Sequence, residues 1–235
     1  MSDSIATIPL PNLAIAALPL LALIALMFRW STNAGGAVYA AARMLLQLVL
    51  IGYALTWIFS VNSPFLVLGV LTIMLAAASW IALRPISDNR GRLLGASLCA
   101  ITASGGLTLA LITLAVLEAD PWYQPQLVIP LAGMIFASSM NAVSIAAERF
   151  ASETGRGISL IDARNEAFQA ALIPLLNSLL AVGLVSLPGM MTGQILSGVD
   201  PLIAVRYQIM VMCMLTGAAG IAAAIYLSLV VRSHA

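Results

Sequence analysis

The stretch between Pro188 and Met210 combines polar side chains, glycines, prolines and methionines between two apolar runs, and it holds the residues whose types and spacing are most informative. Its polar members include Gln194, Arg206 and Gln208, which stand between apolar runs. A polar side chain in such surroundings usually faces a protein interior or an aqueous path, because facing lipid is costly. Glycines and thioethers accompany them: Gly189, Met190, Met191 and Gly193. We take these residues as candidates for a transport path and its gate. The alternative is an interfacial helix that only anchors a loop.

Breaks within this stretch predict a jointed connector between two helices. Pro188 and the glycine after it should stop the apolar run that ends at Leu187. Asp200 and Pro201 are typical of a helix start, because Asp supplies a capping oxygen and Pro tolerates the first helical position. Between the breaks, residues 190–196 could form about two turns of helix. We expect the glycines at 189, 193 and 198 to let the backbone bend or approach a neighbouring helix closely.

The composition is that of a polytopic membrane protein. Of the 235 residues, 62% are hydrophobic and 8% are charged, whereas a soluble domain carries about a quarter charged residues. The ten basic residues are all arginines, so no P-loop lysine can reach nucleotide phosphates. One histidine, His234, cannot build a hydrolytic triad or a paired-histidine zinc site. The net charge of +1 gives no sign of nucleic-acid binding. We predict neither enzyme activity nor a cofactor in this chain.

Seven apolar segments predict an all-α fold with about seven transmembrane helices in a single domain, residues 1–235. Each is close to the length that crosses a bilayer; they are 10–28, 37–59, 64–83, 94–117, 126–147, 168–187 and 202–231. Seven spans would put Arg206 on the side of Asp3 and all other arginines on the opposite side: Arg29, Arg43, Arg84, Arg90, Arg92, Arg149, Arg156, Arg164 and Arg232. The positive-inside rule then places the N-terminus outside and the C-terminus in the cytoplasm.

Polar groups inside the predicted spans are further path candidates. Arg43 and Gln47 are four residues apart and share one helix face. Arg43 could instead snorkel to lipid phosphates, while we expect Gln47 to face the bundle interior. Asn141 could line a path, but it also continues a four-residue spacing with Gly133 and Ala137 that suits close helix packing.

The metal chemistry of the chain cannot be fixed from its residues. Methionines are frequent in the second half. Thioethers bind soft Cu(I) well and iron poorly, and we favour flexible apolar packing as the role of these methionines. The predicted spans have no interior carboxylate. Carriers coupled to protons or sodium usually have one near the bilayer centre. Energy from a separate ATPase therefore fits better, and any metal site stays unknown.

The longest polar stretch runs from Glu148 to Glu166, between the fifth and sixth predicted spans. Apolar residues interrupt its charges, which predicts a short element that packs on the membrane surface or on a partner. The candidates for this contact are Ile158, Leu160, Ile161, Asp162, Arg164 and Glu166.

Several motifs resemble one known family. The sequence from Leu187 reads Leu-Pro-Gly-Met-Met-Thr-Gly-Gln-Ile, followed by Asp-Pro at 200–201 and Arg-Tyr-Gln-Ile-Met at 206–210. Residues 43–52, 128–134 and 170–174 carry shorter matches. The pattern resembles the FetB-like permeases, the membrane subunits of a proposed iron-export ABC transporter. The resemblance covers about residues 37–230.

This resemblance implies a permease in the inner membrane that works as a homodimer with separate ATPase subunits and exports a metal, iron, by alternating access. Residues 158–166 would then contact the ATPase. The alternatives are a stand-alone secondary metal carrier and a non-transporting membrane scaffold.

One departure from the family pattern lies in the same connection. Family members carry a longer segment there, including a Leu-Gly-Ala-Thr/Ser-Pro-like sequence expected to dock on the ATPase. Here residues 154–157, Thr-Gly-Arg-Gly, lead directly to residues 158–169. Either residues 158–166 replace the docking helix or coupling to an ATPase is impaired.

Overall fold

The computed structural model describes residues 8–61, 63–86 and 90–234, and these residues are almost wholly helical. They contain no β-strand beyond one isolated bridge, between Val182 and Ser186. The predicted all-α class is therefore confirmed. The chain divides into two compact units, Met1–Ser60 and Val61–Ala235, which are described separately below. Asp3, placed outside by the topology prediction, lies beyond the described residues.

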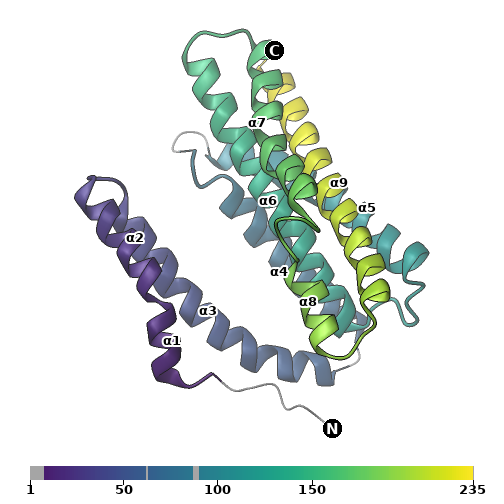
Figure 1. Cartoon of the computed structure of the whole chain (residues 1–235). Coiled ribbons are helices and arrows are strands. Elements are labelled where there is room, and N and C mark those ends of the chain that lie inside the picture. Colours follow the sequence, from purple (N-terminus) through teal and green to yellow (C-terminus); the bar gives the residue numbers. More distant parts are fainter. Residues whose placement is uncertain (1–7, 62, 87–89, 235) are drawn as a thin grey trace. The chain divides into compact units, whose positions relative to one another are not determined.

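The first unit is a helical hairpin (Figure 1). Its helices are α1 (Leu10–Ala16), α2 (Leu18–Arg29) and α3 (Ala34–Ser60). The two prolines of the first apolar segment sit at the starts of α1 and α2, where a missing N–H breaks no intrahelical bond. The segment therefore bends at Ala17. Before α3, Asn33 Oδ1 accepts the backbone N–H of Gly36 at 2.9 Å, which caps the long helix.

The second unit is a bundle in which the last helix contacts most of the others. Its elements are α4 (Pro64–Ala82), α5 (Arg90–Ala110), the π-helix η1 (Leu111–Val116), α6 (Pro125–Gly155), α7 (Leu160–Ala181), α8 (Gly189–Leu196) and α9 (Pro201–His234). Helix α9 packs on α5, α6, α7 and α8.

Small residues let these helices approach closely. Ala218, Ala219, Ala222 and Ala223 of α9 are all fully buried. Ser104 of α5 donates its hydroxyl to the carbonyl oxygen of Ala218 at 2.6 Å. Alanines and serines allow close backbone contact between membrane helices, where van der Waals packing and interhelical hydrogen bonds drive association.

Six helices are long and apolar enough to cross a membrane, counting only the residues that the structure describes. They are Pro11–Arg29, Ala34–Ser60, Pro64–Ala82, Arg90–Val116, Pro125–Gly155 and Pro201–Ser233. Helix α7, which holds most of the sixth predicted span, differs because its first half is polar, with Asp162, Arg164 and Glu166. Its 22 residues are about 33 Å long, the thickness of a hydrocarbon core.

Two predicted span boundaries were wrong. The apolar run 168–187 leaves the helix after Ala181, because the chain turns at Gly183 with a φ of +84°. The run 126–147 continues as helix to Gly155. Its extension is charged but helix-compatible, with Arg149 and Glu153 paired four residues apart. Hydropathy marks where the apolar surface stops, not where the helix ends.

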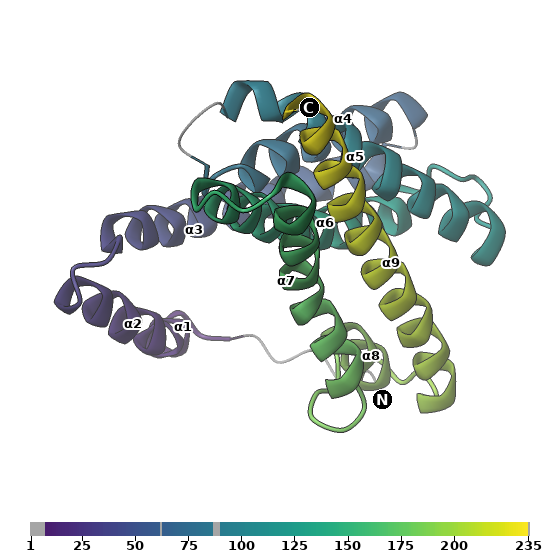
Figure 2. The same cartoon turned by 90° about the horizontal axis from the view of Figure 1, so that it is seen from above.

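The two ends of the second unit differ in charge. The α6–α7 turn and the end of α9 lie towards the top of Figure 1, and α8 lies towards the bottom. Arg149, Arg156, Arg164 and Arg232 belong to the upper end by their helices, while Arg206 lies in the first turns of α9 near α8. Figure 2 shows α8 between the diverging ends of α7 and α9.

Candidate functional site

The connector between α7 and α9 is jointed, as the sequence predicts. The short helix expected over 190–196 is α8, and the expected helix start at Asp200 is present. Asp200 Oδ1 accepts the backbone N–H of Leu202 at 2.8 Å. Gly198, just after α8, has a φ of +87°, which an L side chain rarely adopts. This glycine is therefore required by the turn itself.

Two buried amides are the main polar feature of this joint. Gln208 of α9 is only 6% exposed, and Gln194 of α8 is half-buried. The Oε1 atoms of both are inaccessible to solvent and have no hydrogen-bond partner among the described residues. A buried polar atom without a partner costs roughly 1–3 kcal/mol. The joint thus holds polar groups that a cargo could satisfy.

A cavity of about 400 Å³ lies between the end of α7, the turn after it and α9, and neither Gln194 nor Gln208 is among the residues that line it. Met212 lines it and lies one turn beyond Gln208 on the same face of α9. The other lining residues are mostly small or polar: Asn177, Ser178, Ala181, Val182, Ser186 and Pro188. Sequence analysis missed this polar set because its members lie on the apolar run assigned to a plain span.

The remaining predicted path residues are half-buried or exposed. Met190 and Met191 are half-buried on α8, and Arg206 is exposed. Gln47 in the hairpin is exposed, and so is Asn141 on α6. Gly133 belongs to the same four-residue spacing as Asn141. It does face a neighbouring helix, because a Cβ there would lie 3.3 Å from the Met74 side chain.

Of the two roles expected for Gly189 and Gly193, backbone bending or close helix approach, close approach is not present in this structure. A Cβ added at either position would meet nothing within 4 Å. Neither has the positive φ found at Gly198. In this conformation both glycines lie on a surface with free space around them, so neither is needed for tight helix packing.

The proposed coupling residues do not form a separate element. Ile158 precedes α7, and Leu160, Ile161, Asp162, Arg164 and Glu166 occupy its first two turns. Ser159 caps the helix, since its Oγ accepts the backbone N–H of Asp162 at 3.2 Å. Ile158 is 38% exposed and Ile161 is 53% exposed. The start of α7 therefore presents apolar and charged side chains to a partner, and it is part of a bundle helix rather than a separate element.

Sequence reasoning missed a buried carboxylate in the same connection. Glu153, near the end of α6, is 2% exposed. Arg149 Nη2 lies 2.8 Å from its Oε1 and Arg156 Nη1 lies 3.7 Å away. Both contacts are ion pairs without a well-aligned hydrogen bond. A buried charge requires such pairing, so this cluster fixes the end of α6. The i, i+4 spacing of Arg149 and Glu153 was the available signal.

Metal ligands are not gathered in the usual way. Among the described residues, no group of three or more histidines, cysteines or carboxylates could hold a metal ion. Cys99 and Cys213 are free and exposed.

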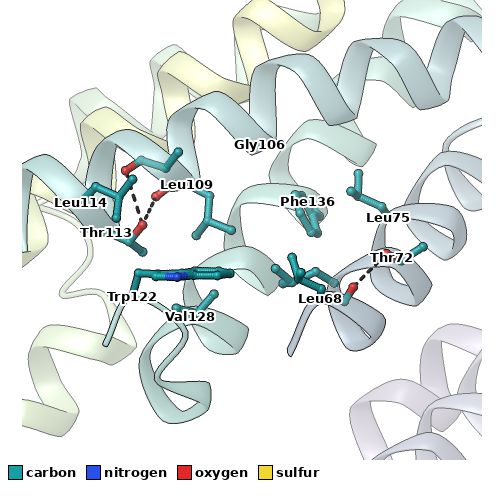
Figure 3. Close-up of a pocket in the computed structure, with 12 residues that line it drawn as sticks. Leu68, Thr72, Leu75, Gly106, Leu109, Thr113, Leu114, Trp122, Val128 and Phe136 are labelled. Atoms are coloured by element: carbon teal, nitrogen blue, oxygen red, sulfur yellow. Dashed lines mark hydrogen bonds between the residues drawn. The ribbon is translucent and has the colours of Figure 1, made fainter. Parts of the chain in front are cut away.

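A second and larger cavity, of about 480 Å³, lies among α4, α5, η1 and α6 (Figure 3). Its lining is apolar apart from two threonines, and Trp122 borders it. The sequence gave no sign of it, because leucines at helical spacing look alike whether they fill a core or line a cavity.

Comparison with known proteins agrees with the motifs. The model of an uncharacterised protein family, UPF0014, matches residues 10–164 and 158–234. The two matched segments overlap at residues 158–164, at the start of α7.

Several relatives cover most of the chain. A UPF0014 membrane protein, slr1647, from Synechocystis is 39% identical over 76% of this chain and 74% of its own length. The Escherichia coli "Probable iron export permease protein FetB" is 37% identical over 78% of this chain and 75% of its own length. The Arabidopsis thaliana "Protein ALUMINUM SENSITIVE 3" is 30% identical over 87% and 80%. No solved structure matches. With multiple apolar helices and these relatives, the chain belongs to the UPF0014 family of multi-pass membrane proteins.

Proposed function

We propose that this chain is the permease subunit of an ABC-type transporter that exports a metal ion, iron, with energy from a separate ATPase. The observation that carries the proposal is the joint of α7, α8 and α9, where two buried amide oxygens have no hydrogen-bond partner among the described residues and a cavity begins one helical turn along α9 from Gln208. The iron cargo rests on the name of the Escherichia coli relative, and another relative is named for aluminium sensitivity.

The two ends of the bundle suit different tasks in this proposal. The arginine-rich end, with the α6–α7 turn and the end of α9, would lie in the cytoplasm. The joint would then face outside, and the N-terminus would be outside as well if α7 crosses with its neighbours. ATP binding to a docked ATPase would move α6 and α7 from the cytoplasmic end and open the joint from the other.

Transport requires a complete path, so we propose a homodimer in the inner membrane, each copy with its own ATPase. The exposed surface of Ile158, Ile161 and Glu166 is the proposed ATPase contact. Ile161 and Glu166 lie on α7 itself. A movement of the ATPase against this surface would therefore be transmitted along the helix to the joint without an intervening loop.

The direct test is ATP-dependent uptake of ferrous iron into inside-out vesicles that contain this chain and its ATPase. We expect uptake only with both subunits present. A matched preparation would carry an ATPase whose catalytic carboxylate is replaced, which should bind but not transport. Uptake that persists without any ATPase would favour a stand-alone carrier instead. Absence of both association and uptake would favour a scaffold.

A second test addresses the contact surface. Replacing Ile158, Leu160 and Ile161 by Ser should abolish co-purification of the ATPase without loss of membrane insertion. Three leucine-to-serine changes at the exposed positions Leu45, Leu46 and Leu48 of α3 form the control. Unchanged co-purification in the first variant would contradict the proposed contact.

A further inference from the structure

The cavity among α4, α5, η1 and α6 is separate in its chemistry from the polar joint. Its volume is about 480 Å³, within the range of small-ligand sites. Figure 3 shows Trp122 on one side of the cavity and Phe136 and Leu75 towards the other. The principal walls are Leu68, Leu75, Leu109, Leu114, Trp122 and Phe136.

The lining offers a ligand almost no hydrogen bond. Thr72 donates its hydroxyl to the carbonyl oxygen of Leu68 at 2.8 Å, and Thr113 donates to that of Leu109 at 2.8 Å. Both lining hydroxyls thus already donate to their own helices, and no charged side chain lines the cavity. An apolar cavity of this kind stays dry and takes apolar guests. The complementary ligand is therefore an alkyl chain.

One glycine and the π-helix η1 both contribute to the lining of the cavity. A Cβ at Gly106 would meet nothing within 4 Å, whereas at the adjacent Gly105 it would lie 3.0 Å from Phe136. Gly106 therefore leaves room on the cavity side. Beyond it, Leu117 donates its N–H to Ile112 at 2.9 Å, five residues back. Such wide turns are rare and often occur at functional sites.

The mouth of the cavity carries features of a membrane–water interface. Trp122 is 41% exposed and lies edge-on to Tyr123. Tryptophan and tyrosine concentrate where headgroups begin. The connection that supplies Trp122 also carries two exposed carboxylates, Glu118 and Asp120, and no basic residue. These charges complement an amine and repel an anionic headgroup.

We propose that this cavity binds one acyl chain of a membrane phospholipid with an amine-bearing headgroup, which stays beside the Trp122 connection. The bound chain fills the space between α4 and η1. The proposal does not depend on the cargo or on the ATPase.

The test uses the full-length chain in mild detergent and native mass spectrometry. With phosphatidylethanolamine supplied, wild-type protein should retain one phospholipid per chain. Phosphatidylglycerol with the same acyl chains should be retained at least tenfold less. The mass of the retained molecule distinguishes a phospholipid from a free fatty acid, and retention of the fatty acid alone would overturn the proposal.

Gly106→Leu fills the cavity and should lower retention at least tenfold. Gly217→Leu is the matched control, because Gly217 is exposed on α9, outside the cavity, and a Cβ there also meets nothing within 4 Å. Equal retention in Gly106→Leu and the control would contradict the site.

A second measurement avoids the risk that Gly106→Leu does not fold. Trp30, Trp57 and Trp80 are replaced by Phe, which leaves Trp122 as the reporter. Phosphatidylethanolamine with brominated acyl chains is then titrated into the detergent solution. Quenching of Trp122 fluorescence should saturate at about one lipid per chain. Quenching that rises only with the lipid-to-detergent ratio would mean bulk partitioning and would overturn the proposal.

Discussion

The hairpin of residues 1–60 and the bundle that follows are built from similarly apolar helices but bury them very differently. In the most apolar windows of the hairpin helices, 6% and 0% of residues are buried, whereas the four membrane-length helices of the bundle bury 28% to 50%. In the hairpin, α2 packs against α3 alone among the long helices of that unit. In the bundle, α9 packs against α5, α6, α7 and α8. Apolarity therefore indicates which segments enter the membrane, and small residues and hydroxyls indicate which of them pack together.

The largest effect should come from breaking the ion pair between the buried Glu153 and the partly exposed Arg149 in the bundle. Arg149→Gln leaves Glu153 buried, with Arg156 as its remaining partner at 3.7 Å. We expect a loss of about 3 kcal/mol in the free energy of unfolding, the lower end for a buried charge that loses a partner. The hairpin control is Arg43→Gln, an exposed position where the change should stay within about 0.5 kcal/mol. Equal losses measured in denaturant titrations would show that the hairpin is packed as tightly as the bundle.

Overpacking the bundle core should have the next largest effect. Ala222 of α9 is fully buried, so Ala222→Leu must displace neighbours and should cost about 2 kcal/mol. The same change at Ala42, exposed on α3, should leave the melting temperature nearly unchanged. Thermal unfolding in one detergent compares the two. A large loss at Ala42 would mean that this face of α3 packs against another part of the protein in detergent.

The sequence predicted the features that depend on local chemistry. The helix start at Asp200, the short helix after Pro188 and the helical class all follow from capping, proline and periodicity. It did not predict the end of α7 at Ala181, because Gly183 turns the chain inside an apolar run. Nor did it predict which amides are buried. Gln47 and Gln208 both stand among apolar residues, yet Gln47 is exposed and Gln208 is buried. That difference is set by neighbours distant in sequence.

Substitution of Gln208 should have a smaller effect on stability and a separate effect on transport, and Gln47 is its control. Gln208→Leu removes a buried polar atom that has no partner, so we expect stability to rise by about 1 kcal/mol. Transport should fall at least tenfold if this amide meets the cargo. Gln47→Leu, at an exposed position in the hairpin, should change neither by a comparable amount. Normal transport by Gln208→Leu would remove this residue from the path.

The smallest change in stability is expected at Gly193, where the gate and anchor interpretations of α8 differ most. The structure leaves open space there, since a Cβ meets nothing within 4 Å. Gly193→Leu should therefore change the free energy of unfolding by less than about 0.5 kcal/mol, as for a surface substitution.

An interfacial anchor would tolerate the added apolar bulk or bind the membrane better. A gate must close against its neighbours during the cycle, and the leucine would then occupy space that this conformation leaves empty. We expect transport by the reconstituted permease and ATPase to be lost while protein yield and basal ATP hydrolysis stay normal. Gly217→Leu on α9, equally exposed and unhindered, controls for added bulk alone. If both variants transport normally, α8 is an anchor, and the gate must be sought at the buried amide of Gln208.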